Sequence, residues 1–152
     1  MTVIREVTGD DLLGMMEVRL SVEENHLSPE QLENDYGVTV ETLSEGLRQG
    51  LRGWLAEVDG KAVAFCIGDG KTGEMQVVAV RPEYEDQGLG RAVLDPLCEW
   101  LFAQGHSHLW LLANPDPGIR ASGFYERLGW KETGERRGPD IVMTLDRTDQ
   151  MA

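Results

Sequence analysis

The sequence predicts an α/β domain in which seven short strands are combined with four helices. Short runs of β-branched and apolar residues indicate strands, at residues 2–7, 54–58, 61–67, 74–80, 108–113, 131–136 and 141–145. Apolar residues at helical spacing indicate helices, at about residues 8–24, 39–50, 90–104 and 119–130. A length of 152 residues suits one domain. We expect that domain at residues 1–146 and a frayed tail at 147–152.

Capping and turn residues mark the ends of these elements. Thr8 is placed to cap the first helix, and Gly129 to end the last. The pair Asp59-Gly60 predicts a tight hairpin, because both central residues of that turn favour positive φ. Pro96 lies within the third helix and removes one hydrogen bond, so we expect a bend there.

The chain is organised around the segment Met75 to Ala92. Its strand ends at Pro82, and six residues later Gly88 and Gly90 precede a helix. This order directs unpaired backbone N–H groups and the positive end of a helix dipole at one point. Glycine there lets a ligand approach the backbone closely. The segment therefore predicts an anion cradle for a phosphorylated cofactor.

Other glycine-rich motifs fit this segment less well. No Lys-Ser/Thr pair follows the glycines, which argues against a nucleoside triphosphatase. The sequence from Gly88 to Val93 lacks the third glycine of a dinucleotide fingerprint, and no acidic residue follows about twenty positions later. An ordinary helix start remains an alternative on the glycines alone.

Two motifs together resemble the GNAT superfamily of acyl-CoA N-acyltransferases. The first runs from Val78 through Pro82 and Tyr84 to Gly88-Leu89-Gly90, and the second is the segment 121–130, ASGFYERLGW. The similarity covers about residues 53–145. It implies a mixed, mostly antiparallel central sheet flanked by helices. It also implies a variable acceptor-covering segment in which Glu23, Glu24, Asn25 and His26 could meet the acceptor. The alternative for these four residues is the ordinary polarity of a helix end.

The resemblance implies roles for particular residues. The backbone N–H groups of residues 87–91 (Gln87, Gly88, Leu89, Gly90 and Arg91) would hold the pyrophosphate of acetyl-CoA. Val78 and Val80 would pair with its pantetheine arm as an added strand does. Tyr125 would donate a proton to the leaving thiolate, since phenol and thiol pKa values are close. Its alternative role is core packing.

The chain departs from the family pattern at two points. Glu85 and Asp86 occupy the start of the loop, where the family usually has Arg or Gln, and Arg91 is a candidate to offset their charge. The usual Asn seven residues before the tyrosine is replaced by Gly118, which leaves Asn114 as a substitute contact for the cofactor.

Glu74 is the candidate general base. An alkylamine is mostly protonated at neutral pH, so a carboxylate acting directly or through water would help. Even spacing predicts that Glu74 shares one face of its strand with Val78 and Val80. Gln76 shares that face and could orient an acceptor. The alternative for Glu74 is a charged residue at the start of a strand.

These features predict an enzyme that transfers acetyl from acetyl-CoA to a primary amine of a small molecule or peptide. Transfer would proceed by direct attack through a tetrahedral intermediate. The alternative is a non-catalytic acyl-CoA-binding or protein-interaction module on the same fold, motivated by the acidic Glu85-Asp86 pair. A homodimer is possible in either case.

Composition narrows the class of partner and the location. A net charge of −13 argues against nucleic acid, although it is also compatible with simple solubility. No apolar run approaches about eighteen residues and no leader is evident, so we expect a cytoplasmic protein without a membrane segment. Cys66 and Cys98 are expected to be reduced core residues. We expect no metal site, since His106 and His108 lack partners at ligand spacing.

Overall fold

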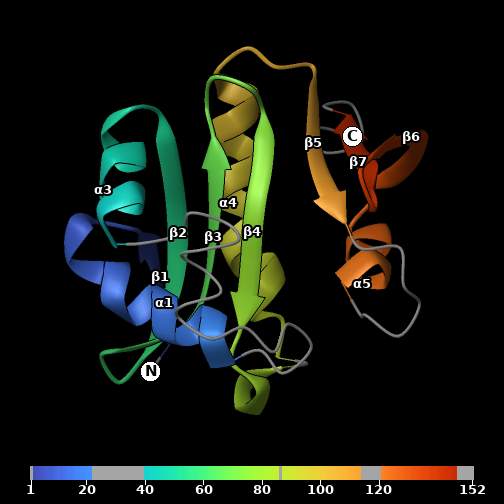
Figure 1. Cartoon of the computed structure of the whole chain (residues 1–152). Coiled ribbons are helices and arrows are strands. Elements are labelled where there is room, and N and C mark those ends of the chain that lie inside the picture. Colours follow the sequence, from blue (N-terminus) through green and yellow to red (C-terminus); the bar gives the residue numbers. More distant parts are fainter. Residues whose placement is uncertain (1, 22–39, 86, 114–120, 147–152) are drawn as a thin grey trace.

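The fold is described here from a computed structural model (Figure 1), in residues 2–21, 40–85, 87–113 and 121–146. Several sequence-based expectations lie outside these ranges. They are the end of the first helix, the loop at 25–38 with Glu23, Glu24, Asn25 and His26, the Thr39 cap, Asp86, Asn114, Gly118 and the tail at 147–152.

One seven-stranded sheet, with strand order β1-β2-β3-β4-β5-β7-β6, forms the centre of the protein. Its strands are β1 (Thr2–Glu6), β2 (Leu51–Val58), β3 (Lys61–Asp69), β4 (Glu74–Val80), β5 (His108–Ala113), β6 (Lys131–Arg137) and β7 (Asp140–Asp146). All neighbours pair antiparallel except β4 and β5, which are parallel. The described helices are η1 (Gly9–Asp11), α1 (Leu12–Ser21), α3 (Val40–Arg48), η3 (Pro82–Tyr84), α4 (Leu89–Ala103) and α5 (Ala121–Arg127). The predicted mixed, mostly antiparallel sheet with helices is confirmed.

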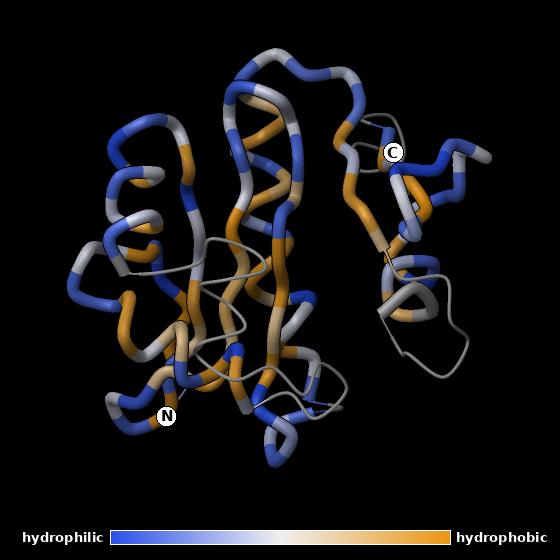
Figure 2. The backbone as a smooth tube through the Cα atoms, viewed as in Figure 1, coloured by the Kyte–Doolittle hydropathy of each residue, from blue (hydrophilic) through white to orange (hydrophobic). Residues whose placement is uncertain are grey.

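Helices cover both faces of the sheet and divide the core in two. On one face, α1 and α3 pack against β2, β3 and β4 around Met15, Val18 and Phe65. On the other face, α4 runs behind the strands and buries Leu97 and Leu101, and Tyr125 of α5 joins the same cluster. We call these the α1 face and the α4 face. Figure 2 shows apolar residues along the central strands and polar residues in the turns at their ends.

The local signals of the sequence form the expected structures. Thr8 and Asp11 make a capping box at η1, in which the Thr8 N–H donates to the Asp11 carboxylate at 2.8 Å. Asp59 and Gly60 both have positive φ, of 52° and 83°, and join β2 to β3 in a tight turn. Gly129 follows α5 with φ 100°. Pro96 is accommodated within a continuous α4.

Both cysteines are free thiols in the core, as predicted. Cys66 on β3 donates its thiol hydrogen to the Val93 carbonyl of α4, with 3.1 Å between sulfur and oxygen. Burial raises the pKa of both thiols, that of Cys98 to about 12. They are therefore protonated packing residues that tie α4 to the sheet.

None of the helices within the described ranges has the length and apolar character that a bilayer crossing requires. Those same ranges contain no group of three or more His, Cys, Asp or Glu side chains placed to hold a metal ion.

Candidate active site

The turn at Gly88 leads directly into α4, where the sequence predicts an anion cradle. Gly88 is the N-cap residue and has φ 77°, a left-handed conformation that suits glycine. The first intrahelical bond runs from the Ala92 N–H to the Gly88 carbonyl, at 3.0 Å. The N–H groups of Leu89, Gly90 and Arg91 therefore have no partner within the helix. Among the described residues, nothing lies within 4 Å of the place that a Cβ on Gly88 would take, which leaves room there for an anionic group.

The two glycines serve different purposes, which corrects the expectation that both admit a ligand. A Cβ on Gly90 would lie 2.9 Å from Cζ of Phe124 and 3.7 Å from Cγ2 of Val80. Gly90 is buried, so its missing side chain makes room for the ring of Phe124 on α5 rather than for a cofactor. Of these two glycines, Gly88 is the one with a positive φ and with no described neighbour within 4 Å of a Cβ.

The side chain of Arg91 forms an ion pair along α4. Its guanidinium is exposed and pairs with Asp95 one turn along α4, with 3.8 Å between nitrogen and oxygen. Glu85 lies in the turn after η3, where its N–H donates to the Pro82 carbonyl at 3.3 Å. The cradle therefore depends on backbone donors.

A β-bulge in β4 sets the direction of the strand's peptide groups. Ile67 pairs with Val77 and Gly68 pairs with Met75, so Gln76 is an extra residue without an opposite partner on β3. Beyond the bulge, the Arg81 N–H donates to the Val63 carbonyl of β3 at 2.8 Å. Because peptide groups alternate along a strand, the N–H groups of Val78 and Val80 point away from β3.

Those N–H groups of Val78 and Val80 face the place where the sheet divides. β4 and β5 pair only at Glu74 and Trp110, and the Trp110 N–H donates to the Gly73 carbonyl at 3.2 Å. Beyond that rung the described strands make no further pairs, and Figure 1 shows them separating toward the Gly88 end of the molecule. At Val78 and Val80 the edge of β4 therefore offers the N–H groups that an added extended strand would use.

The bulge also overturns the predicted position of Glu74. Met75, before the bulge, belongs to the core on the α4 face, and Val78, after it, packs against that same core. Glu74 therefore points to the α1 face, opposite to Val78 and Val80. The even-spacing argument was wrong, because one inserted residue reverses the alternation of side chains.

Glu74 is partly buried on that face, and its carboxylate accepts a hydrogen bond from a neighbouring side chain. Gln76 Nε2 donates to Glu74 Oε1 at 3.4 Å. Burial raises the pKa of the Glu74 carboxyl, and the nearby charge of Asp69 raises it further. The hydrogen bond from Gln76 and the positive charge of Arg137 act in the opposite direction. A raised carboxyl pKa brings this group closer to the range in which a general base works at neutral pH.

Tyr125 lies on the other side of the sheet. Its ring is buried between Phe124 and Trp130, whose ring centres are 5.5 Å and 6.1 Å away. Burial raises the pKa of its phenol, the Cys66 thiol adds to the effect, and the charge of Arg19 on α1 opposes it. The raised pKa of the Tyr125 phenol lies further from that of a thiol, about 8.5. The expectation that these two pKa values are close is therefore corrected. The hydroxyl is kept protonated and can donate a hydrogen bond.

Glu74 and Tyr125 are thus held on opposite faces of the divided sheet rather than in contact. In this arrangement Glu74 could act on a nucleophile that approaches from the α1 face, and Tyr125 on a leaving group on the α4 face. The sequence missed Trp110 and Arg137, which lie beside Glu74. The alternation of inward- and outward-facing residues along β5 is the sequence signal that could have indicated Trp110.

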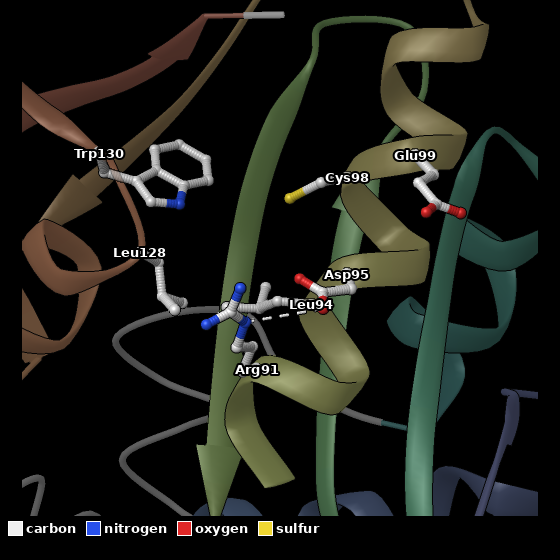
Figure 3. Close-up of a pocket in the computed structure, with 7 residues that line it drawn as sticks. All are labelled: Arg91, Leu94, Asp95, Cys98, Glu99, Leu128 and Trp130. Atoms are coloured by element: carbon white, nitrogen blue, oxygen red, sulfur yellow. Dashed lines mark ion pairs between the residues drawn. The ribbon is translucent and has the colours of Figure 1, made fainter. Parts of the chain in front are cut away.

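A hollow of about 160 Å³ adjoins the cradle on the α4 face. Figure 3 shows Leu128 and Trp130 on one side of it and Arg91 and Asp95 of α4 on the other. The acidic side chains of Asp95 and Glu99 make it unsuited to a phosphate group. The lining of this hollow therefore suits a phosphate group less well than the backbone donors at the Gly88 turn do.

The glycine turn and the split sheet together define an acyltransferase class of α/β domain. The comparison with protein families makes this specific. A model described as "Acetyltransferase (GNAT) family" matches residues 12–130, so the chain belongs to that family, as the sequence motifs indicated.

The chain is similar to characterised members of this family over part of its length. It is 38% identical over 81 residues to the [ribosomal protein bS18]-alanine N-acetyltransferase of Escherichia coli strain K12. That match covers 52% of this chain and 54% of the relative, so the chain spans about half the length of the curated relatives it matches.

Solved structures extend the similarity to almost the whole fold. The crystal structure of the E. coli ribosomal-protein-S18-alanine N-acetyltransferase has a TM-score of 0.74 and 26% identity, over 96% of this chain and 94% of that one. The PaiA N-acetyltransferase of Thermoplasma acidophilum, crystallised in complex with coenzyme A, has a TM-score of 0.80. At 18% identity over 96% and 99% of the two chains, it supports the fold alone.

Proposed function

We propose that the protein transfers the acetyl group of acetyl-CoA to a primary amine, and that the amine is the N-terminus of a peptide or protein. The observation that carries this proposal is the split between β4 and β5 beside the Gly88 cradle. The name of the E. coli relatives, alanine N-acetyltransferases of a ribosomal protein, favours a polypeptide acceptor over a small molecule.

The chain's own residues would hold the donor along the free edge of β4. The N–H groups of Leu89, Gly90 and Arg91, with those of Gln87 and Gly88, would bind the pyrophosphate. The backbone of Val78 and Val80 would pair with the pantetheine arm. Acetyl-CoA would supply a thioester, whose carbonyl oxygen would accept a hydrogen bond from a free N–H of β4.

Glu74 would take the proton from the acceptor amine on the α1 face, directly or through water. The amine nitrogen would then form the new bond to the acetyl carbon, and the carbon–sulfur bond would break after a tetrahedral intermediate. The Tyr125 hydroxyl would donate its hydrogen to the departing sulfur on the α4 face. Because the pKa of Tyr125 is raised, its hydroxyl would first stabilise the developing thiolate by a hydrogen bond. The proton would pass to sulfur only late in the step.

The proposal also includes a cellular location and an oligomeric state. The free thiols Cys66 and Cys98 fit a reducing cytoplasm, which is where we place the protein. A homodimer stays a prediction.

The alternative is a binding module that holds acyl-CoA without turnover. It is favoured by Glu85 next to the cradle and by the absence of direct contact between Glu74 and Tyr125 among the described residues. It shares the cofactor site and differs only in the chemistry.

Calorimetric titration with acetyl-CoA, followed by an assay that counts released thiol in the presence of peptides with free N-termini, tests the proposal. We expect binding, and thiol release that depends on the peptide. Binding without release from any amine would favour the binding module. Lack of binding at millimolar acetyl-CoA would overturn both readings of the cradle. Desulfo- and dephospho-CoA are the controls for the thioester and the phosphates.

A further inference from the structure

Three side chains from three strands meet on the α1 face, at the rung that joins β4 to β5. Glu74 and Trp110 are partners in that rung. Leu109 and Leu111 lie in the core on the α4 face, so Trp110, between them, points to the α1 face. The guanidinium of Arg137, at the end of β6, lies over the Trp110 ring, 4.5 Å from its centre. The Trp110 ring is fixed by its Nε1–H, which donates to the Thr72 carbonyl at 3.1 Å.

Arg137 is held by a ring rather than by a carboxylate. Other described arginines are held in ion pairs with acidic side chains: Arg5, Arg48, Arg52, Arg81 and Arg91. Within the described ranges no carboxylate forms such a pair with Arg137. A guanidinium stacked on an aromatic face keeps its N–H donors in its own plane, where they can bind a carboxylate with two parallel hydrogen bonds.

The charges around this cluster match a ligand that carries both signs. Glu74 and Asp69 provide negative charge where an ammonium group would arrive, and Asp69 pairs with Glu74 across β3 and β4. Arg137 provides the positive charge next to them, and it is close enough to lower the pKa of Glu74. In a chain of net charge −13, a cation in this position is suited to attract a carboxylate at short range.

The strand spacing sets the distance between the two charges of the ligand. Neighbouring strands are ~4.8 Å apart, and the Arg137 guanidinium lies over a ring on the strand next to Glu74, so the separation is roughly 5–10 Å. An extended peptide advances ~3.4 Å per residue, which places the second or third side chain near Arg137 when the first amine is at Glu74.

We propose that Arg137 is a specificity-determining residue, which selects acceptor peptides with an acidic side chain at the second or third position. The inference rests on the proposed transfer to a peptide N-terminus and adds the class of peptide that is preferred. Trp110 is the positioning residue, since its ring holds the guanidinium in place.

Kinetics with three matched peptides test this proposal. The peptides are identical except for Glu, Gln or Lys at the second position, with a second set varied at the third. The wild type should show about 10-fold higher kcat/KM for the better Glu peptide than for its Gln counterpart, expressed mainly in KM. Arg137→Gln should remove that preference, mainly by raising KM for the Glu peptide. Arg137→Lys should keep part of it, because Lys retains the charge but not the planar fork.

Arg136→Gln is the matched control, because Arg136 is the exposed neighbour of Arg137 on the same strand. It should keep the full preference. Equal kcat/KM for Glu and Gln peptides with the wild type, or a preference that survives Arg137→Gln, would overturn the inference.

Binding separates this inference from the proposed function. N-terminally acetylated product peptides keep the acidic side chain, so calorimetry should show about 10-fold weaker binding of the Glu product to Arg137→Gln than to the wild type. That result in a protein that releases no thiol would refute the transferase and support the role of Arg137. Thiol release without any Glu preference in rate or binding would support the transferase and refute the role of Arg137.

Discussion

Replacing Gly90 by Ala should test whether this glycine serves the contact between α4 and α5. The added methyl would lie 2.9 Å from Cζ and 3.3 Å from Cε1 of the Phe124 ring. Ordinary carbon contacts are ~3.5–4.0 Å, so the ring must move by roughly 0.6–1 Å. Phe124 precedes Tyr125 on α5, and the two rings are 5.5 Å apart, so the movement reaches the proposed proton donor.

The expected loss of stability is small because two effects oppose each other. Overpacking of this kind costs about 1–3 kcal/mol, whereas replacing glycine by alanine in a helix gains about 1 kcal/mol. The net loss is therefore roughly 1 kcal/mol, or about 3 °C in Tm for a chain of this size. The loss of activity should be larger, about 10- to 10²-fold in kcat, since a misplacement of ~1 Å can cost ~10²-fold.

A double-mutant cycle with Phe124→Leu isolates the contact. Leucine lacks the outer ring atoms that the new methyl would meet, so Gly90→Ala should cost about 1 kcal/mol less in that background. Urea unfolding measures the free energies and thiol release measures kcat for the four proteins. Strictly additive effects on both quantities would refute the contact as the reason for glycine at this position.

The remaining predictions concern the acid, the base and one turn. Tyr125→Phe should lower kcat by about 10²-fold with little change in acetyl-CoA affinity, and an unchanged kcat would return Tyr125 to packing. Glu74→Gln should lower kcat about 10²-fold or more and abolish the rise of kcat/KM with pH across the raised Glu74 pKa. Because that pKa is raised in the fold, ionised Glu74 subtracts stability as the pH rises through it, so thermal melts of Glu74→Gln at pH 7 should show no loss of Tm. Gly60→Ala places a side chain at φ 83° and should cost about 1 kcal/mol in urea unfolding, and a neutral result would contradict the turn's conformation.

Most elements of the fold could be predicted because their signals are local. The Asp59-Gly60 turn and the strand that ends at Pro82 are specified by residues that are adjacent in the chain. The Gly88 turn and the start of α4 were predictable for the same reason, since they are contiguous in the chain.

The site's finer geometry depends on pairings that a local pattern does not contain. Nothing in the residues around Gln76 marks it as the bulge, because the register is set by pairing with β3, and the facing of Glu74 was therefore misjudged. The partner of Gly90 lies 34 positions away, from 90 to 124, in α5. Arg137 reaches Trp110 only because β7 places β6 two strands from β5.

The single rung between β4 and β5 makes the sheet two plates rather than one. The strands β1 to β4 form one hydrogen-bonded unit and β5, β7 and β6 form the other. In the described part of the chain they are joined in the sheet at Glu74 and Trp110, and outside it by packing against α4 and by side-chain hydrogen bonds to the β3–β4 turn, such as that of Trp110 to Thr72. Each plate can therefore open locally at its own free energy, and slow amide exchange in one does not require it in the other. A donor that lies along the free edge of β4 and contacts α5 would bridge the plates. Its binding free energy would then slow amide exchange most in the β5–β7–β6 plate. The local opening of one plate would also become coupled to that of the other, although the backbone alone leaves the two nearly independent.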